Sequence, residues 1–568
     1  MNRYGITHIT DSSYCFPISS NEIVLRLRTV RDDIKQAYVI YESKYVFGEE
    51  QKRKEMEKAY TGQLFDYYTV TLTLEDTRLA YVFYVCDGEK NYYFSEDGIT
   101  DSYNFKLGFY NFFQYPYINK ADVMKYVSWM GHMSFYQIFV DRFYMGRNDK
   151  DKSYVNCKWG DIPTPKTFAG GDIPGITKKL DYIKDMGCNA IYLTPVFKSI
   201  SNHKYDISDY WNVDEHFGTN EDLKELVSSL HKKGMYIVLD AVFNHCSDLM
   251  EQFQDVKKKG KFSRYYDWFV IYGDEIDNDK CNYETFAACE YMPKLNTSNP
   301  EVMKYLIDIA CYYITEYHID GWRLDVSDEI SHSFWRKFRI KVKEAGRRIG
   351  RDIVIIGENW HDAHNYLRGD QYDSIMNYAF TKACLDFFKT GEIDAAEMAY
   401  KLNDLLMRNN DIVNKMMLNL LDSHDTHRFY SEIGESREKM KLALSLLYLY
   451  PGVPCIFYGT EILTKGGYDP DCRRCMDWDK AENDSEKDIK ELIKYLGGLR
   501  NKYDFSESKT RIYSENQVLI VRRFSEKYKV SLYINNTDNE RMVEDLVIKP
   551  YGLVIDENRK ENGGCFYG

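Results

Sequence analysis

The sequence predicts an α/β fold: a parallel (β/α)8 barrel, preceded by a β-sandwich and followed by an antiparallel β-domain. Three observations support this prediction. Short, almost wholly apolar runs, typical of buried parallel strands, recur eight times after residue 134. Amphipathic helical stretches separate these runs. Val-, Ile- and Tyr-rich runs with partial alternation occupy both ends of the chain.

Residues 1–120 are predicted to form the N-terminal sandwich. Their strand-like runs are EIVLRLRTV, QAYVIYES, DYYTVTLTL and LAYVFYVCDG, separated by charged or Gly-containing turns. This spacing indicates antiparallel strands.

Residues 121–503 are predicted to form the barrel. Its candidate strands are FYQIFV (135–140), NAIYLTPVF (189–197), MYIVLDAVF (235–243), IDGWRLDV (319–326), DIVIIGE (352–358), SIMNYAF (374–380), MMLNLLDS (416–423) and PCIFYGTE (454–461). Eight runs, each followed by a helical stretch, match a TIM barrel. Residues 244–300 are too long and too aromatic for a bare crossover, so we expect an inserted subdomain after the third strand. Residues 504–568 return to strand-like runs and predict the C-terminal β-domain.

The composition narrows the possible partners and compartments. Of 568 residues, 75 are Lys or Arg and 88 are Asp or Glu, a net charge of −13 that disfavours nucleic acid and anionic membranes. We expect a cytoplasmic protein, since neither an export signal nor a long apolar stretch is apparent. Thirteen scattered cysteines fit reduced thiols. Cys472 and Cys475 leave a zinc or redox site as a minor alternative.

Charged and polar residues gather where the predicted strands end. These residues are Asp240, Asn244 and His245 at the end of the third run, Arg323 and Asp325 in the fourth, Glu358 at the end of the fifth, and His424 and Asp425 at the end of the seventh. One such residue is usually a loop or cap residue. Four such strand ends in one barrel predict an active site, because the loops there build the pocket.

The residue types suit glycoside cleavage, which needs one protonated and one ionised carboxyl group. Asp325 follows Arg323 by two residues, so both side chains share a face and the guanidinium favours an ionised nucleophile. Glu358 leaves an apolar strand beside Trp360, where its pKa should rise toward that of a general acid. The spacing alone leaves retention and inversion both open.

Four ordered motifs carry a resemblance to a known family: DAVFNH (240–245), GWRLDVSDE (321–329), IIGENW (355–360) and LLDSHD (420–425). They resemble the α-amylase family, glycoside hydrolase family 13. MPKLN (292–296), NYETF (282–286) and YDPDCRR (468–474) resemble its neopullulanase, cyclomaltodextrinase and maltogenic amylase subgroup.

The resemblance implies a retaining mechanism. Asp325 is similar to the nucleophile, Glu358 to the acid/base and Asp425 to the third carboxylate. Sugar contacts are implied for Tyr205, the neighbouring His203, His245 and His424, with Asp240 and Arg323 supporting the site. Glu284 and Trp360 are candidates for the cleft, and Asp469 and Arg473 for its closed end; simple packing or surface roles remain open for these four.

The resemblance requires no cofactor for the chemistry but implies a structural Ca²⁺. Its candidate ligands are Asn148, Asp149, Asp151, Gly170 and Asp172. MGRNDKDK departs from the usual pattern, with Met145 and Arg147 at expected ligand positions, so calcium binding stays open.

We therefore expect an α-glucan hydrolase that cleaves α-1,4 bonds of cyclodextrins, maltooligosaccharides and pullulan, with some transglycosylation. Alternatives are a 4-α-glucanotransferase, an α-1,6-acting oligosaccharide hydrolase and a non-catalytic glucan-binding protein. Asn359 stands where relatives often carry an apolar residue, which leaves the balance between hydrolysis and transfer open. The N-terminal sandwich is expected to form a homodimer; a plain polysaccharide-binding role is the alternative.

Overall fold

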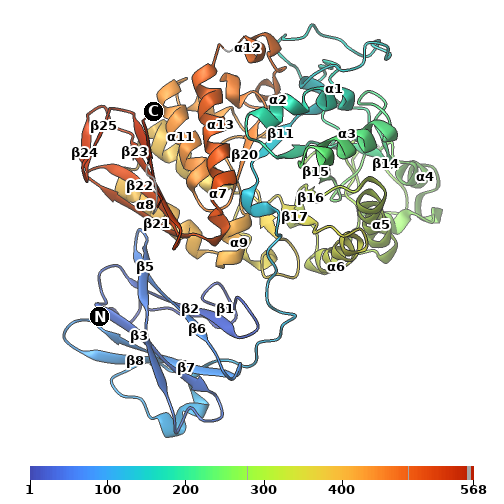
Figure 1. Cartoon of the computed structure of the whole chain (residues 1–568). Coiled ribbons are helices and arrows are strands. Elements are labelled where there is room, and N and C mark those ends of the chain that lie inside the picture. Colours follow the sequence, from blue (N-terminus) through green and yellow to red (C-terminus); the bar gives the residue numbers. More distant parts are fainter. Residues whose placement is uncertain (278, 484, 560–563, 568) are drawn as a thin grey trace.

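The predicted fold class is confirmed by a computed structural model, which describes residues 1–277, 279–483, 485–559 and 564–567. Along the chain, a parallel barrel follows an N-terminal β-sandwich and precedes C-terminal antiparallel sheets, and Figure 1 shows the two β-domains as neighbours. Parts of the predicted C-terminal domain, residues 560–563 and 568, lie outside the described residues.

Eight parallel strands pair in chain order around the barrel. They are β11 (Phe135–Ile138), β12 (Ala190–Leu193), β15 (Tyr236–Ala241), β16 (Gly321–Leu324), β17 (Val354–Gly357), β18 (Ser374–Ile375), β19 (Leu418–Leu420) and β20 (Val453–Phe457). A parallel bridge between Met376 and Leu418 joins the two ends of the sheet. Seven of these strands lie within their predicted runs, and β20 begins one residue before its run, at Val453. All eight are buried apart from Tyr236, because both faces of a barrel strand are covered.

Helices cover the outside of the barrel. They are α1 (Ile173–Lys178), α2 (Leu180–Asp185), α3 (Asn220–Lys232), α5 (Pro300–Tyr317), α6 (His332–Arg348), α7 (Tyr378–Leu385), α8 (Ala395–Met407), α9 (Asp411–Met416), α10 (Phe429–Glu432), α11 (Arg437–Leu449), α12 (Trp478–Glu482) and α13 (Lys487–Lys502). Helix α3 begins at a Thr219–Asp222 capping box. It buries the predicted stripe of Leu223, Leu226, Val227 and Leu230.

The fifth connection differs from the prediction that a helix follows every strand. Between β17 and β18 it contains only a short 3-10 turn, His364–Tyr366. Its sequence, from Glu358 to Asp373, is rich in Asn, Asp and His and has no apolar repeat of helical period, so there is no stripe to pack against the barrel.

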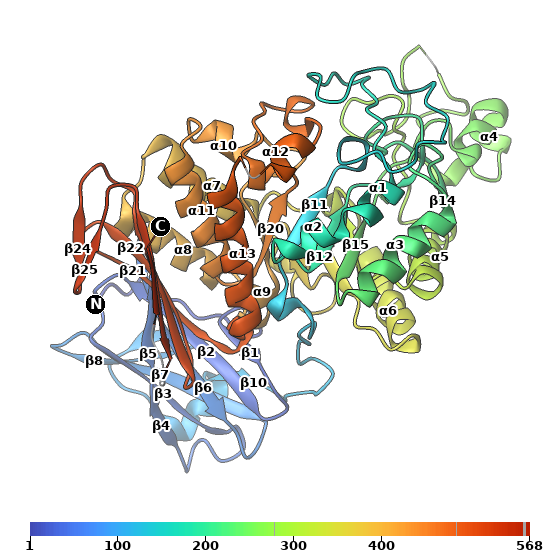
Figure 2. The ribbon, with the colours of Figure 1, turned by 45° about the horizontal axis from the view of Figure 1, so that its top comes forward.

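The N-terminal sandwich consists of two antiparallel sheets, β1-β2-β6-β5 and β4-β3-β7-β8-β9, with β10 on β7. Its strands are β1 (Cys15–Pro17), β2 (Glu22–Val30), β3 (Gln36–Ser43), β4 (Lys52–Glu55), β5 (Glu57–Thr61), β6 (Phe65–Thr73), β7 (Leu79–Cys86), β8 (Asn91–Ser95), β9 (Gly98–Thr100) and β10 (Phe113–Tyr115). Buried Arg26 ties it to the barrel by donating to the Asn409 carbonyl over 2.8 Å, and Tyr67 donates to Asp404. The sandwich thus lies beside α8, α9 and the C-terminal sheet (Figure 2).

The C-terminal sheets contain β21 (Lys509–Glu515), β22 (Val518–Phe524), β23 (Tyr528–Asn535), β24 (Arg541–Val543), β25 (Leu546–Ile548), β26 (Leu553–Arg559) and β27 (Gly564–Tyr567). The inserted segment after β15 contains α4 (Glu251–Lys259) and two short 3-10 turns. A two-stranded sheet, β13 (Phe197–Ser199) with β14 (Ile207–Val213), lies between β12 and α3. No helix among the described residues is long and apolar enough to span a membrane.

Candidate active site

Arg323 is the charged centre of the candidate site. Its guanidinium is buried, with Nη1 lying 3.0 Å from Asp240 and 2.8 Å from Asp325. Its Nη2 lies 2.7 Å from Glu358. Three neighbouring strands, β15, β16 and β17, thus bring three carboxyl groups to one cation.

Asp325 and Glu358 share that cation but differ in their remaining contacts. Glu358 accepts a hydrogen bond from the Val326 amide over 2.9 Å. The second oxygen of Asp325, Oδ2, is buried and has no hydrogen-bond partner among the described residues. Burial raises the pKa of both carboxyls, and the charge of Glu358 raises that of Asp325 further. At neutral pH the pair therefore favours one shared proton, as a nucleophile and a general acid require.

Asp240 is held as a supporting carboxylate. Besides Arg323, it accepts hydrogen bonds from the hydroxyls of Tyr192 over 2.6 Å and Tyr205 over 2.9 Å. Burial raises the pKa of Asp240 to about 6. Asp240 is 1% exposed and, held by these donors, it orients Arg323 and Tyr205.

Asp425 closes the other side of the site. Its carboxylate lies 3.1 Å from His424 Nε2 and 3.3 Å from Arg473. Arg473 also lies 2.9 Å from Asp469 and donates to the His424 carbonyl over 2.8 Å. Asp425 keeps about a quarter of its side chain exposed, so its oxygens remain accessible to a sugar.

Tyr205 and two histidines form a set of nearly parallel rings. The ring of Tyr205 lies 5.5 Å from that of His424 at an angle of 3°, and 5.9 Å from that of His203 at 26°. His203 Nδ1 accepts from the Tyr205 amide over 3.1 Å. Burial lowers the pKa of His203 to about 3, so both histidines are neutral hydrogen-bonding groups.

His245 brings the inserted segment to the site. Its backbone pairs with Lys294, in the MPKLN block, and Lys294 Nζ donates to Asn244 over 2.6 Å. Its ring stacks on Phe286 with 4.7 Å between centroids. His245 Nε2 is buried without a partner among the described residues, and burial lowers its pKa to about 3.

Of the four candidates for the cleft and its closed end, three lie near the site and Glu284 does not join the carboxyls around Arg323. Trp360 is 46% exposed and stacks on Tyr378 at 3.7 Å, which leaves one face of its indole free as a platform. Asp469 and Arg473 lie beside Asp425, as described above. Glu284 is exposed, and its carboxylate accepts from the Tyr272 hydroxyl within the inserted segment rather than joining the carboxyls around Arg323.

Four residues at or beside the site were not predicted from the sequence: Gln137, Tyr192, Phe286 and Tyr378. Gln137 is the only strongly polar side chain in the predicted run FYQIFV, and a polar residue in a barrel strand was the available signal. The three aromatic residues carried no such signal among fifty tyrosines and thirty phenylalanines.

Two further predicted groups are the cysteine pair and the candidate calcium ligands. Cys472 and Cys475 are buried, burial raises the pKa values of their thiols to about 12 and about 11, and Cys472 contacts the His424 carbonyl. The residues that the resemblance assigns to Ca²⁺ do not form a calcium cage, because the Lys150 ammonium lies 2.5 Å from the Gly170 carbonyl and 2.9 Å from Asp172.

Two family models match most of the chain. The α-amylase catalytic domain matches residues 137–515, and the α-amylase N-terminal ig-like domain matches residues 1–119. A cyclomaltodextrinase of Thermoanaerobacter pseudethanolicus is 42% identical over 96% of this chain and 94% of its own length. The Bacillus subtilis (strain 168) intracellular maltogenic amylase and neopullulanase 2 of Thermoactinomyces vulgaris are each 40% identical, over 88% of this chain and 84% of their own lengths.

A solved cyclomaltodextrinase structure superposes with a TM-score of 0.89 at 36% identity, covering 95% of this chain and 92% of that one. Both the matched sequence domains and the barrel-end carboxyl cluster therefore place this chain in the α-amylase family.

Proposed function

We propose that this protein is a retaining α-glucan hydrolase that cleaves α-1,4 bonds in cyclodextrins, maltooligosaccharides and pullulan. The observation that carries the proposal is the arrangement of Asp325 and Glu358 on one buried arginine, with no hydrogen-bond partner for Asp325 Oδ2 in the part of the chain that the structure describes. The names of the relatives support the choice of substrates: they are cyclomaltodextrinases, a maltogenic amylase and a neopullulanase.

In the first step, Asp325 Oδ2 attacks the anomeric carbon and the bond to the leaving oxygen breaks. Glu358 gives its proton to that oxygen, so the leaving sugar departs as a neutral alcohol. The product is a covalent glucosyl ester of Asp325. In the second step, Glu358 takes a proton from water, the resulting hydroxide attacks the same carbon, and Asp325 is released as a carboxylate.

The surrounding side chains bind the reacting sugar. The neutral His245 and His424 offer N–H groups to sugar hydroxyls, and Asp425 offers carboxylate oxygens. The ring of Tyr205 offers an apolar face to the sugar ring. Hydrogen bonds that shorten as the ring flattens would stabilise the oxocarbenium-like transition state.

Transfer to a sugar acceptor is proposed as a side reaction. The exposed indole of Trp360 lies two residues from Glu358 and provides a flat surface on which an acceptor sugar can stack near the acid/base. A stacked sugar competes with water for the covalent intermediate.

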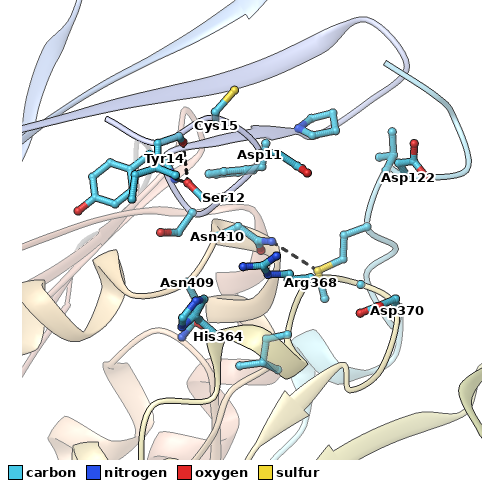
Figure 3. A pocket seen from close by; sticks show the side chains of 18 of the residues that line it. Asp11, Ser12, Tyr14, Cys15, Asp122, His364, Arg368, Asp370, Asn409 and Asn410 are labelled. Carbon is cyan, nitrogen blue, oxygen red and sulfur yellow. Dashed lines mark hydrogen bonds between the residues drawn. The ribbon is translucent and has the colours of Figure 1, made fainter. Parts of the chain in front are cut away.

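A homodimer is proposed on the basis of the resemblance and of one cleft. The cleft, of about 2020 Å³, lies between the N-terminal sandwich and the barrel, and Figure 3 shows its walls, with Asp11 and Tyr14 on one side and His364 and Arg368 on the other. Four apolar side chains that line it are exposed: Ile9 by 54%, Leu64 by 65%, Tyr117 by 48% and Ile340 by 57%. Exposed apolar side chains of this kind favour contact with a second copy of the chain.

Light scattering tests the dimer. A mass of twice 67.2 kDa supports it, and loss of that mass in the double variant Leu64→Asp, Ile340→Asp would assign the contact to this cleft. A wild-type mass of one chain at micromolar concentration would contradict it.

A cytoplasmic location is proposed from the Bacillus subtilis relative, which is named intracellular.

The substrate proposal is tested by a product profile. Purified protein is given β-cyclodextrin, pullulan and soluble starch in parallel at equal mass, and the products are separated by chromatography. Fast opening of cyclodextrin to maltose and glucose, with slow release of panose from pullulan, supports the proposal. Disproportionation to longer oligosaccharides would instead favour a 4-α-glucanotransferase. Cleavage confined to α-1,6 bonds would favour an α-1,6-acting oligosaccharide hydrolase.

A further inference from the structure

The segment between β11 and α1 contains the residues that the resemblance assigns to calcium, but they are not gathered as a cage. Asn148, Asp149 and Asp151 are exposed, whereas Gly170 and Asp172 are buried. The Asp151 carboxylate accepts from the amide and hydroxyl of Ser153. Within the described part of the chain, no group of three or more His, Cys, Asp or Glu side chains is placed to hold a metal ion.

A lysine ammonium lies where the two buried ligands converge. Lys150 Nζ is 2.5 Å from the Gly170 carbonyl, 2.9 Å from Asp172 Oδ2 and 3.3 Å from the His216 carbonyl. Its side chain is only 10% exposed. An ammonium has three N–H donors, and here each of them has an oxygen acceptor.

The Asp172 carboxylate has no oxygen left for a metal. Oδ1 accepts from the amides of Gly146 and Gly175, both over 2.8 Å. Oδ2 accepts from the Arg147 amide over 3.2 Å and pairs with Lys150. The same carboxylate caps the N-terminus of α1, so its position is set by the fold.

We propose that Lys150 takes the place of a structural calcium ion, holding the Gly170 carbonyl and the Asp172 carboxylate together by its own positive charge. The cation is thus part of the chain, and the stability of this region does not depend on free calcium. A buried ammonium between a carboxylate and two carbonyls supplies the charge compensation that a hard cation would supply there.

The lysine ties together segments that lead to the active site. His216, whose carbonyl Lys150 binds, also accepts from the Tyr154 hydroxyl and stacks on the Tyr154 ring at 3.8 Å. In the same segment, the Thr167 carbonyl accepts from Asn202 over 2.9 Å, one residue before His203. Lys150 therefore stabilises the wall against which the Tyr205 loop packs.

Thermal unfolding of the full chain tests this proposal without reference to activity. We expect the same Tm for wild-type protein in EDTA and in millimolar CaCl₂, and no binding heat when Ca²⁺ is titrated into EDTA-treated protein. We expect Lys150→Met to lower Tm by about 2 to 5 °C, because it leaves Asp172 buried without a counter-charge. Lys152→Met, an exposed lysine of the same loop, is the matched control and should leave Tm unchanged.

Two results would overturn the proposal. One is a wild-type Tm that falls on chelation and recovers with Ca²⁺, or uptake of one equivalent of Ca²⁺ in calorimetry, since either would show a metal in this role. The other is a Lys150→Met variant as stable as Lys152→Met, since the ammonium would then support nothing. The calcium measurements need only wild-type protein, so they decide the matter even if Lys150→Met does not fold.

Discussion

Gln137 Nε2 lies 2.7 Å from His424 Nδ1 in the buried barrel mouth, and this contact fixes which nitrogen of the histidine carries the proton. Burial, together with the charges of Arg473 and Arg323, lowers the pKa of His424 far below its ordinary value, so the ring is neutral. A neutral imidazole has one donor and one acceptor nitrogen.

The neighbours of Nε2 agree with the tautomer that the Gln137 contact favours. Nε2 faces the Asp425 carboxylate, which only accepts, and the Tyr205 oxygen, whose proton is engaged by Asp240. Nε2 is therefore the donor, and Nδ1 accepts from the Gln137 amide. Gln137 acts as a positioning residue that keeps an N–H of His424 directed at Asp425 and the sugar.

Replacing Gln137 should change the pH dependence of the reaction as well as its rate. We expect Gln137→Leu to lower kcat by about 10- to 100-fold, because the ring loses its fixed tautomer. Gln137→Glu places an acceptor opposite Nδ1, which favours the imidazolium and should add an ionisation to the profile of kcat/KM against pH. Gln114→Glu, exposed on the sandwich, is the control. An unchanged profile in Gln137→Glu would contradict the tautomer assignment.

Asp325→Asn should abolish turnover while substrate binding persists. The amide cannot form the covalent ester, and we expect a loss of about 10⁴-fold or more in kcat with a dissociation constant for maltooligosaccharide within a few-fold of wild type. Steady-state kinetics and calorimetry measure the two quantities. Ordinary turnover in this variant would remove Asp325 from the nucleophile role.

Glu358→Gln should discriminate between leaving groups. The departing oxygen of a maltooligosaccharide needs a proton, whereas the fluoride of a glycosyl fluoride departs with little acid assistance. The rate of the first step should therefore fall much more for the oligosaccharide than for the fluoride. Single-turnover rates on both substrates test this. Equal losses on the two would contradict an acid role for Glu358.

The raised pKa of Glu358 also predicts a stability effect. Between its unfolded value of 4.5 and its higher folded pKa, the folded protein retains a proton that the unfolded chain has released. Stability contributed by this group is therefore full below the unfolded pKa and lost as pH rises through the folded pKa. Glu358→Gln removes the titration, so the difference between its Tm and that of wild type should move in favour of the variant as pH rises above 4.5. A difference that moves in favour of wild type as pH rises would contradict this.

The barrel could be predicted from the sequence because its strands are buried on both faces and appear as continuous apolar runs. The strand-end carboxyls were equally visible, since Asp240, Asp325 and Glu358 lie at or near the ends of three consecutive runs. The lack of a helix in the fifth connection could not be predicted as easily, because it appears in the sequence only as the absence of an apolar repeat of helical period. Gln137 was missed because its partner, His424, lies two strands away across β20, a contact that depends on barrel closure.

The calcium prediction shows a different limit of the sequence. A sequence motif for calcium specifies positions that carry oxygen ligands. A lysine within such a motif indicates from sequence only that one ligand is missing. That the Lys150 ammonium reaches the Gly170 carbonyl and Asp172 depends on the path of the loop in three dimensions. Similarly, NYETF marks the inserted segment, but the position of Glu284 away from Arg323 is set by its contact with Tyr272.

The most direct test of the mechanism is to trap the covalent intermediate in Glu358→Gln with maltosyl fluoride. Fluoride departs without an acid, and the missing base slows the attack of water, so the maltosyl ester should accumulate. Mass spectrometry should then show an increase of one maltosyl unit, located on the peptide that contains Asp325. An adduct on another residue, or consumption of the fluoride with no adduct under rapid quench, would contradict the account.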